Sequence, residues 1–237
     1  LNRVELLLHY HPKGLWGGTF HHLANIVLRR YAKLLGFESN FSILDQDDSK
    51  NVLKSCLADL RIDTKKEFFP KPDVIHAILS FKQNSVTSIQ EVVEKRFSHL
   101  NPQIIPTLER IYIRFQEKKL KTNTLDFDDL LYYWWILLKN NSMVRKKISE
   151  QFYYVLVDEY QDTNTIQAEI IKMLGSSHNN IVVVGDDSQS IYSFRAADIN
   201  NILHFPDTFP ETKIFKLQTN YRSTPEILDL ANHSIKN

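Results

Sequence analysis

Two short, almost uninterrupted apolar runs in the C-terminal half of the chain do most to limit how it can fold. Residues 153–157 and 181–185 consist mainly of Val, Ile, Leu and Tyr, a composition typical of strands buried on both faces of a parallel sheet. Between them, residues 165–174 carry apolar side chains at the spacing of an amphipathic helix. A third run, residues 213–217, follows a helical segment at residues 201–205. This alternation predicts an α/β fold with a parallel sheet.

The N-terminal part of the chain is expected to contribute to the same sheet. Residues 14–20 resemble a further strand, and residues 21–35 a helix that ends at Gly36. Glycine is the residue that most readily adopts the left-handed conformation found just beyond a helix.

The middle of the chain has no strand pattern, and helical patterns predominate from residue 45 to residue 123. Asp45 and Ser88 stand where N-caps are expected. An all-helical stretch between the strands of one sheet predicts an inserted subdomain. Four helical segments are expected in it: residues 47–60, 71–82, 89–99 and 102–121.

Composition adds a few limits. The 237 residues are enough for one large or two small domains, and the net charge of +1 argues neither for nor against a nucleic-acid partner. The single cysteine, Cys56, excludes an internal disulfide. No apolar run approaches the ~20 residues that span a bilayer. We therefore expect a cytoplasmic protein without membrane contact.

Two carboxylates follow the first predicted strand directly. Asp158 and Glu159 stand at the carboxyl end of this strand, the edge where ligands of α/β proteins bind. One carboxylate can hold Mg²⁺ through water, and its neighbour can orient or deprotonate an attacking water. The alternative is a strand that ends in solvated acids. The polar segment as far as Asn164 lies where the next helix begins, so its side chains can cap that helix or face a ligand.

Aromatic and arginine side chains gather after the second predicted strand. Tyr192, Phe194 and Arg195 lie within four residues of one another, where large apolar side chains would otherwise be exposed. Such groups can stack on unpaired bases at ~1–3 kcal/mol each without reading sequence.

Five segments together resemble superfamily 1 helicases of the UvrD/Rep/PcrA group. Residues 158–164, DEYQDTN, resemble motif II of that family. Residues 184–198 resemble motif III, and residues 217–224 resemble motif IV. Residues 18–21 resemble motif Ib, and residues 125–131 the segment that re-enters the core after the helical insertion. The segments occur in the order and spacing of the family, so the resemblance covers essentially the whole chain.

The resemblance implies an α/β fold: a partial RecA-like P-loop NTPase parallel sheet with an inserted all-helical subdomain. Residues 1–44 and 124–212 would form part of the first RecA-like domain (1A). Residues 45–123 would form the helical subdomain (1B). Residues 213–237 would begin the second RecA-like domain (2A).

The resemblance also implies roles at a nucleotide site that binds ATP and Mg²⁺. Asp158 would bind Mg²⁺, and Glu159 would be the catalytic base that positions water. Gln189 would sense the γ-phosphate and link it to the DNA groove. Arg222 would act as an arginine finger in cis, which stabilises charge that grows in the transition state. Gln161 and Asp162 would connect the motifs by hydrogen bonds.

A binding surface for single-stranded DNA, and for junctions of single- and double-stranded DNA, is implied as well. Thr19 and His21 would contact backbone phosphates. The alternative for Phe127 and Phe194 is packing in the core. Four side chains would stack on bases: Phe127, Tyr192, Phe194 and Arg195.

The implied activity is that of an ATP-dependent 3′-to-5′ DNA helicase or translocase, of which the chain is a fragment, in DNA repair or replication restart. One alternative is the helicase subunit of a recombination helicase–nuclease. The other is a non-catalytic module that binds single-stranded DNA. The sequence contains no Gly-x-x-x-x-Gly-Lys-Ser/Thr phosphate loop. We expect that loop upstream of Leu1, and we expect this chain by itself to lack ATPase activity.

Overall fold

The structure, a computed structural model, describes residues 6, 7, 9, 14–63, 69–189, 197–217 and 219–235. It has a mixed α/β architecture that is mostly helical, with two small parallel sheets. The strands are β1 (Ser42–Ile43), β2 (Thr124–Leu125), β3 (Val155–Val157) and β4 (Ile181–Val183). The described helices are α2 (Phe20–Tyr31), α3 (Gln46–Asp59), α4 (Pro72–Ser85), α5 (Ile89–Arg96), α6 (Ile105–Lys121), α7 (Phe127–Asn140), α8 (Ser142–Gln151), α9 (Thr165–Leu174), α10 (Asn200–Leu203), α11 (Phe205–Thr208) and α12 (Pro225–Ile235).

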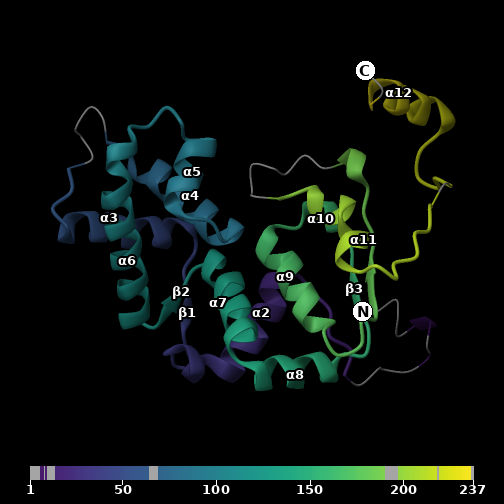
Figure 1. Ribbon diagram of the computed structural model, residues 1–237, viewed down its shortest axis with the longest axis horizontal. Coiled ribbons are helices and arrows are strands. Elements are labelled where there is room, and N and C mark those ends of the chain that lie inside the picture. Colours follow the sequence, from purple (N-terminus) through teal and green to yellow (C-terminus); the bar gives the residue numbers. More distant parts are fainter. Residues whose placement is uncertain are drawn as a thin grey trace.

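Helices α3–α6 pack around an apolar core of their own, on one side of the molecule (Figure 1). The four helical segments predicted there are confirmed. Asp45 caps α3 by accepting a hydrogen bond from the Asp48 backbone N–H at 2.8 Å. Ser88 caps α5 by accepting one from the Glu91 N–H at 3.1 Å. Short polar side chains thus begin these helices, as expected from the capping rule.

A second apolar core lies between α2, α7, α8 and α9. Helix α7 is apolar on most of its surface, and Trp134 and Leu138 in it are almost completely buried. It contacts α2, α4, α8 and α9, so several of its sides are covered by other helices. The predicted helix over residues 21–35 is confirmed as α2 with a following 3₁₀ turn, closed by Gly36 at a φ of 84°.

Each sheet pairs two parallel strands. In the first, Ser42 lies opposite Thr124, so the helical segment between β1 and β2 starts and ends at neighbouring points. In the second, Val155 lies opposite Ile181 and Val157 opposite Val183. The strands predicted at residues 153–157 and 181–185 are therefore present in shorter form.

The prediction that these strands are buried on both faces is wrong for the described part of the chain. Val157 and Val183 pack against a small cluster around Tyr160 and Phe205. Leu156, whose side chain points the other way, is 74% exposed, and Val182 is 49% exposed. Side chains alternate along a strand, and helices cover only one face of β3 and β4 among the described residues.

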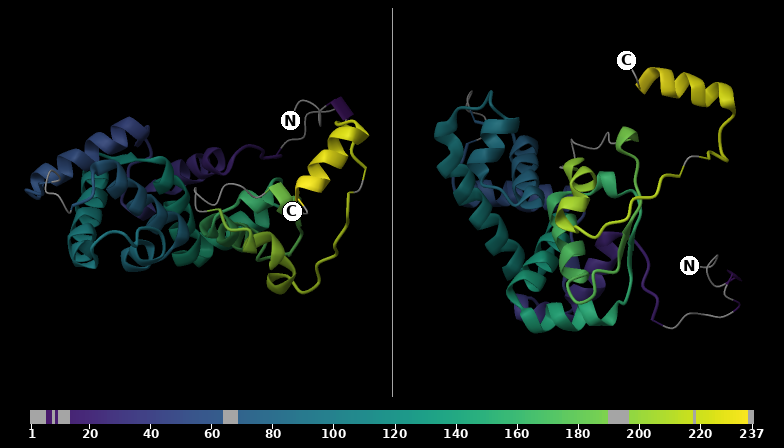
Figure 2. Two further views of the ribbon diagram at one scale, coloured as in Figure 1. Left: turned by 90° about the horizontal axis from the view of Figure 1, so that it is seen from above. Right: turned by 45° about the vertical axis from the view of Figure 1, so that its right-hand side comes forward.

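Two predicted strands are absent from the described structure. Residues 14–19 are irregular, because Thr19 uses its hydroxyl to cap α2 and Phe20 is already helical. Residues 213–217 form no strand in the described structure, and Phe215 is 83% exposed. A strand needs a neighbouring strand to satisfy its backbone groups, and none of the described strands lies beside this segment. Figure 2 shows the segment leading to α12, which stands apart from the rest of the molecule. Within the described residues, every helix is too short or too polar to cross a membrane.

Candidate functional site

The predicted carboxylate pair lies just beyond β3. Asp158 and Glu159 are both exposed, and the Glu159 N–H donates a hydrogen bond to Asp158 Oδ1 at 3.1 Å. Glu159 has a φ of 51° and a ψ of 45°, in the left-handed region. Residues other than glycine pay about 1–3 kcal/mol for such conformations, which cluster at functional sites. Val86 and Asn123 share a positive φ, so it is the position directly beyond β3 that makes Glu159 a candidate active-site residue.

Backbone hydrogen bonds hold the ends of β3 and β4 together. The Val184 N–H donates to Val157 O at 2.8 Å, and the Tyr160 N–H donates to Val184 O at 2.9 Å. The chain after β4 forms a 3₁₀ turn that carries Gln189. Gln189 Nε2 donates to Asp186 Oδ2 at 2.9 Å. The structure thus places two predicted site segments at one edge of the sheet.

Gln161 joins these two segments directly. Its Nε2 donates to Glu159 Oε2 at 2.7 Å, and its Oε1 accepts from the Asp186 N–H at 3.1 Å. The connecting role expected from the sequence is therefore observed for Gln161. Asp162 is different, because its Oδ1 is buried and has no hydrogen-bond partner among the residues that the structure describes. Burial, followed by the charge of Glu159, raises the pKa of Asp162.

Asp158 and Glu159 fit the carboxylate part of a Mg²⁺ site in which water and substrate phosphates supply the other oxygen ligands. No cluster of three or more metal-binding side chains occurs in the described parts of the chain. Mg²⁺ commonly binds one or two carboxylates and takes its remaining oxygens from water and substrate phosphates. Two adjacent exposed carboxylates satisfy that requirement.

The other predicted site residues are distributed as follows. Arg222 is exposed and lies three residues before α12, on the segment that Figure 2 shows apart from the rest of the molecule. Thr19 is exposed and caps α2. Phe127 begins α7, is 50% exposed and therefore does not pack in the core. The centroid of its ring lies 5.9 Å from the centroid of the His21 ring, in an edge-on arrangement. Tyr192, Phe194 and Arg195 lie outside the described residues.

A cavity of about 770 Å³ opens beside Phe127 and His21, between α3 and α4 and the starts of α2, α7 and α9. Its lining includes Asp45, Asp73 and Asp128. Burial lowers the pKa of His21, although Asp128 acts in the opposite direction, so the imidazole is neutral at pH 7. Lys50 also lines the cavity, but its Nζ pairs with Asp73 at 3.0 Å. The remaining carboxylates disfavour phosphate, whereas an aromatic ring and neutral polar groups can accept an uncharged base.

A hydrogen-bonded bridge that sequence reasoning missed crosses the wall of this cavity. Asn84 of α4 is 7% exposed. Its Nδ2 donates to Asp128 Oδ1 at 2.8 Å, and its Oδ1 accepts from Asn164 Nδ2 at 2.9 Å. Asn164 ends the DEYQDTN segment and caps α9. The helical segment therefore contacts the end of the acidic motif. The partners are 44 and 80 residues from Asn84 in sequence, so no local pattern signals the bridge.

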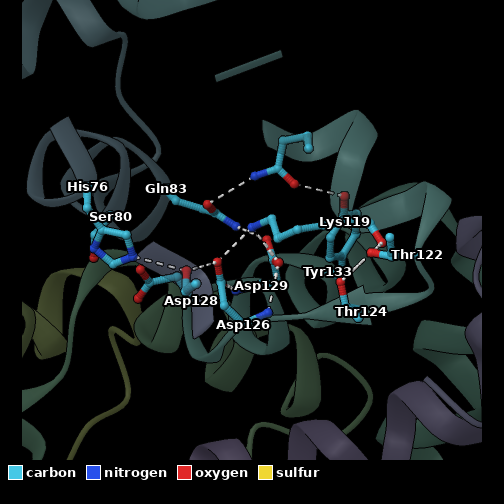
Figure 3. Close-up of polar contacts among 12 residues, drawn as sticks. His76, Ser80, Gln83, Lys119, Thr122, Thr124, Asp126, Asp128, Asp129 and Tyr133 are labelled. Atoms are coloured by element: carbon cyan, nitrogen blue, oxygen red, sulfur yellow. Dashed lines mark hydrogen bonds and ion pairs between the residues drawn. The ribbon is translucent and has the colours of Figure 1, made fainter. Parts of the chain in front are cut away.

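A buried charged cluster surrounds Lys119, next to Asp128 (Figure 3). Lys119 is 1% exposed, and its Nζ lies 2.7 Å from Asp126 Oδ2 and 2.6 Å from Asp129 Oδ2. Gln83 Nε2 donates to Asp129 Oδ1 at 2.7 Å. Burial, together with the charge of Asp126, raises the pKa of Asp129 to about 6 against the opposing effect of Lys119. Through Lys119 of α6 and Gln83 of α4, this cluster links both helices to the acidic residues at the start of α7.

Replacing Asn84 by Ala is expected to lower the free energy of unfolding by about 1–3 kcal/mol, because Asn164 Nδ2 and Asp128 Oδ1 lose their shared partner. Urea unfolding followed by circular dichroism measures the change. Gln90→Ala on α5 is the control, since Gln90 is exposed and donates its hydrogen bond to Glu94 on the same helix surface. The bridge would have no stabilising role if both variants unfolded at the same urea concentration.

Together these features define a mixed α/β protein with a candidate ligand site at the carboxyl ends of parallel strands, next to the helical segment α3–α6. The chain belongs to the family described as the UvrD/REP helicase N-terminal domain, which it matches over residues 2–210. The family resemblance seen in the sequence is therefore confirmed. Among curated proteins, the chain is similar to the ATP-dependent DNA helicases PcrA of Staphylococcus epidermidis and Staphylococcus aureus. It is 39% identical to them over 234 and 235 residues, which cover 99% of the chain and 31% of each relative. The chain thus spans about a third of the length of these relatives.

Proposed function

We propose that the chain is part of an ATP-dependent DNA helicase or translocase that moves 3′ to 5′ on single-stranded DNA. The observation that carries the proposal is the edge of the β3–β4 sheet, where Glu159 is tied through Gln161 to the loop that holds Gln189. The relatives named ATP-dependent DNA helicases support it.

The proposed fold is a RecA-like domain interrupted by a helical subdomain. Parallel pairing of β3 with β4 supports the first part, because RecA-like sheets are parallel. The neighbouring ends of the helical segment at Ser42 and Thr124 support an insertion spanning residues 45–123. The exposed apolar side chain of Leu156 is consistent with a sheet face that a further part of the domain covers.

In the proposed site, Glu159 orients the attacking water and accepts its proton, and Asp158 holds Mg²⁺. Gln189 contacts the γ-phosphate. Mg²⁺ neutralises charge on the phosphates of ATP when it is bound. Arg222 would reach the phosphate only after the segment before α12 is brought towards the sheet, since that segment stands apart from the rest of the molecule (Figure 2).

The chain by itself is proposed to bind DNA without hydrolysing ATP. Its sequence has no Gly-rich phosphate loop with a Lys for the β and γ oxygens. That observation favours a second candidate function for the isolated chain, a non-catalytic module for single-stranded DNA.

DNA binding is proposed to involve the cavity beside Phe127 and His21. The half-exposed Phe127 ring can stack on a base. Thr19 and His21, at the start of α2, would donate hydrogen bonds to phosphates just outside the acidic cavity. The positive end of the α2 dipole favours an anion at the same place.

The Phe127→Ala variant is expected to bind single-stranded DNA about 5- to 150-fold more weakly, because base stacking contributes ~1–3 kcal/mol per base. Fluorescence anisotropy with a labelled oligonucleotide at fixed salt gives the dissociation constant. Met143→Ala removes another exposed apolar side chain, 80% exposed and at the start of α8, and serves as the control. Equal affinities for wild type and Phe127→Ala would show that Phe127 does not contribute to DNA binding.

The function is tested with the full-length protein that contains this chain. ATP hydrolysis is measured with and without single-stranded DNA, and strand displacement is measured on duplexes with a 3′ or a 5′ single-stranded tail. We expect hydrolysis stimulated by DNA and displacement only from the 3′ tail. A full-length protein without ATPase activity would contradict the proposal, and displacement from the 5′ tail would contradict the direction.

A further inference from the structure

The amide of Gln161 is unusual because it is buried and bonded at both ends. The residue lies in the 3₁₀ turn Tyr160–Asp162 and is 1% exposed. Its two partners fix the orientation of the amide, since a carboxylate can only accept and a backbone N–H can only donate. Nε2 therefore faces Glu159 Oε2, and Oε1 faces the Asp186 N–H.

The backbone at Gly185 is shaped to allow this contact. A Cβ atom at Gly185 would lie 2.5 Å from Gln161 Oε1 and 2.6 Å from Ile202 Cδ1. Neither separation is sterically possible without movement of Gln161 or Ile202. The absence of a side chain at position 185 thus lets the Gln161 amide reach the loop after β4.

The contacts of Gln161 continue to a second predicted site residue. Asp186, which donates its N–H to Gln161, also accepts a hydrogen bond from Gln189 Nε2 through Oδ2 at 2.9 Å. Three hydrogen bonds therefore join the Glu159 carboxylate to the Gln189 amide. By contrast, Glu159 itself is exposed and its side chain has several rotatable bonds.

We propose that Gln161 is a positioning residue that holds the Glu159 carboxylate in the orientation needed to act on water. The inference rests on the proposed ATP hydrolysis. Gln161 does not touch the reacting atoms; it restricts a mobile carboxylate and aligns it with the loop that carries Gln189. Misplacement of a catalytic group by about 1 Å can lower a rate by about 10²-fold, so loss of this restraint affects kcat more than substrate affinity.

Two substitutions separate this role from a purely structural one. Gln161→Met keeps the length of the side chain and removes both hydrogen bonds. Gln161→Glu keeps an oxygen that can accept from the Asp186 N–H, but it replaces the donor to Glu159 by a second carboxylate oxygen. If the bond to Glu159 is what matters, both variants of the full-length protein lose kcat by about 10- to 100-fold, with little change in the KM for ATP.

The matched control is Gln90→Met. Gln90 Nε2 donates to Glu94 Oε1 at 2.8 Å, the same kind of bond on the surface of α5, and its loss is expected to leave kcat and KM unchanged. A double-mutant cycle with Glu159→Gln adds a second test. Because Gln161 is proposed to act through Glu159, Gln161→Met should lower the residual kcat of Glu159→Gln by much less than it lowers the wild-type kcat.

Wild-type kcat in Gln161→Glu would overturn the inference, because that variant retains the bond to Asp186 and lacks the one to Glu159. Additive effects in the cycle would overturn it as well. If Gln161→Met fails to fold, the kcat of Gln161→Glu and a double-mutant cycle that combines Gln161→Glu with Glu159→Gln still test the inference. A wild-type protein without ATPase activity would instead contradict the proposed function, which keeps the two failures distinct.

Discussion

Replacing Lys119 by Met is expected to lower the free energy of unfolding by about 3–5 kcal/mol, the usual effect of removing one partner from a buried ion pair. Lys119 is 1% exposed and lies between Asp126 and Asp129, which are 6% and 0% exposed. Without the ammonium group, two buried carboxylates face each other with no compensating cation. Chemical unfolding followed by circular dichroism measures the loss, with Lys121→Met, at an exposed position of the same helix end, as the control.

The destabilisation by Lys119→Met should also depend on pH in a defined direction. Burial already raises the pKa of Asp129 to about 6 from an ordinary value of 3.8, although Lys119 opposes the rise. Removing Lys119 raises the pKa in the folded state further, so the folded protein holds a proton that the unfolded chain releases. Stability is then lost as pH rises from about 4 through the raised pKa. We expect Lys119→Met to lower the free energy of unfolding more near pH 8 than near pH 5. An equal decrease at both pH values would contradict the role of Lys119 in compensating the buried carboxylates.

Replacing Glu159 by Gln in the full-length protein is expected to lower the kcat of DNA-stimulated ATP hydrolysis by about 10²- to 10⁴-fold, the contribution typical of a general base. The amide keeps the shape of the side chain but cannot accept a proton from water. Affinity for ATP and for single-stranded DNA should change little, because Glu159 is proposed to act on water. Steady-state kinetics and equilibrium binding measure both quantities.

The control for Glu159→Gln is Glu150→Gln, which changes an exposed carboxylate that pairs with Lys146 on the surface of α8. It should keep the wild-type kcat. A Glu159→Gln variant that hydrolysed ATP at the wild-type rate would exclude Glu159 as the base and would leave the acidic pair with a metal-binding role at most.

The placement of the acidic pair at the sheet edge could be predicted because its residues directly follow a strand in sequence. Asp158 and Glu159 come directly after an apolar strand, and parallel strands bring their carboxyl ends to one edge. The site residues on the other segments depend on longer-range placement. Arg222 lies on a segment that stands apart from the sheet, and the proposed stacking residues from Tyr192 to Arg195 lie outside the described structure.

The sequence by itself determined most of the helices, the caps Asp45 and Ser88, the acidic strand end and the family, because each depends on residues within a few positions of one another. Only the tertiary structure decided that Lys119 is buried, because a helix end with Lys118, Lys119 and Lys121 is in sequence most simply a solvated one. It also decided the Asn84 bridge, the one-sided sheet and the absence of a strand at residues 213–217. The physical reason is common to all four. Burial, ion pairing and strand pairing depend on partners distant in sequence, and periodicity carries no information about which partner a side chain meets.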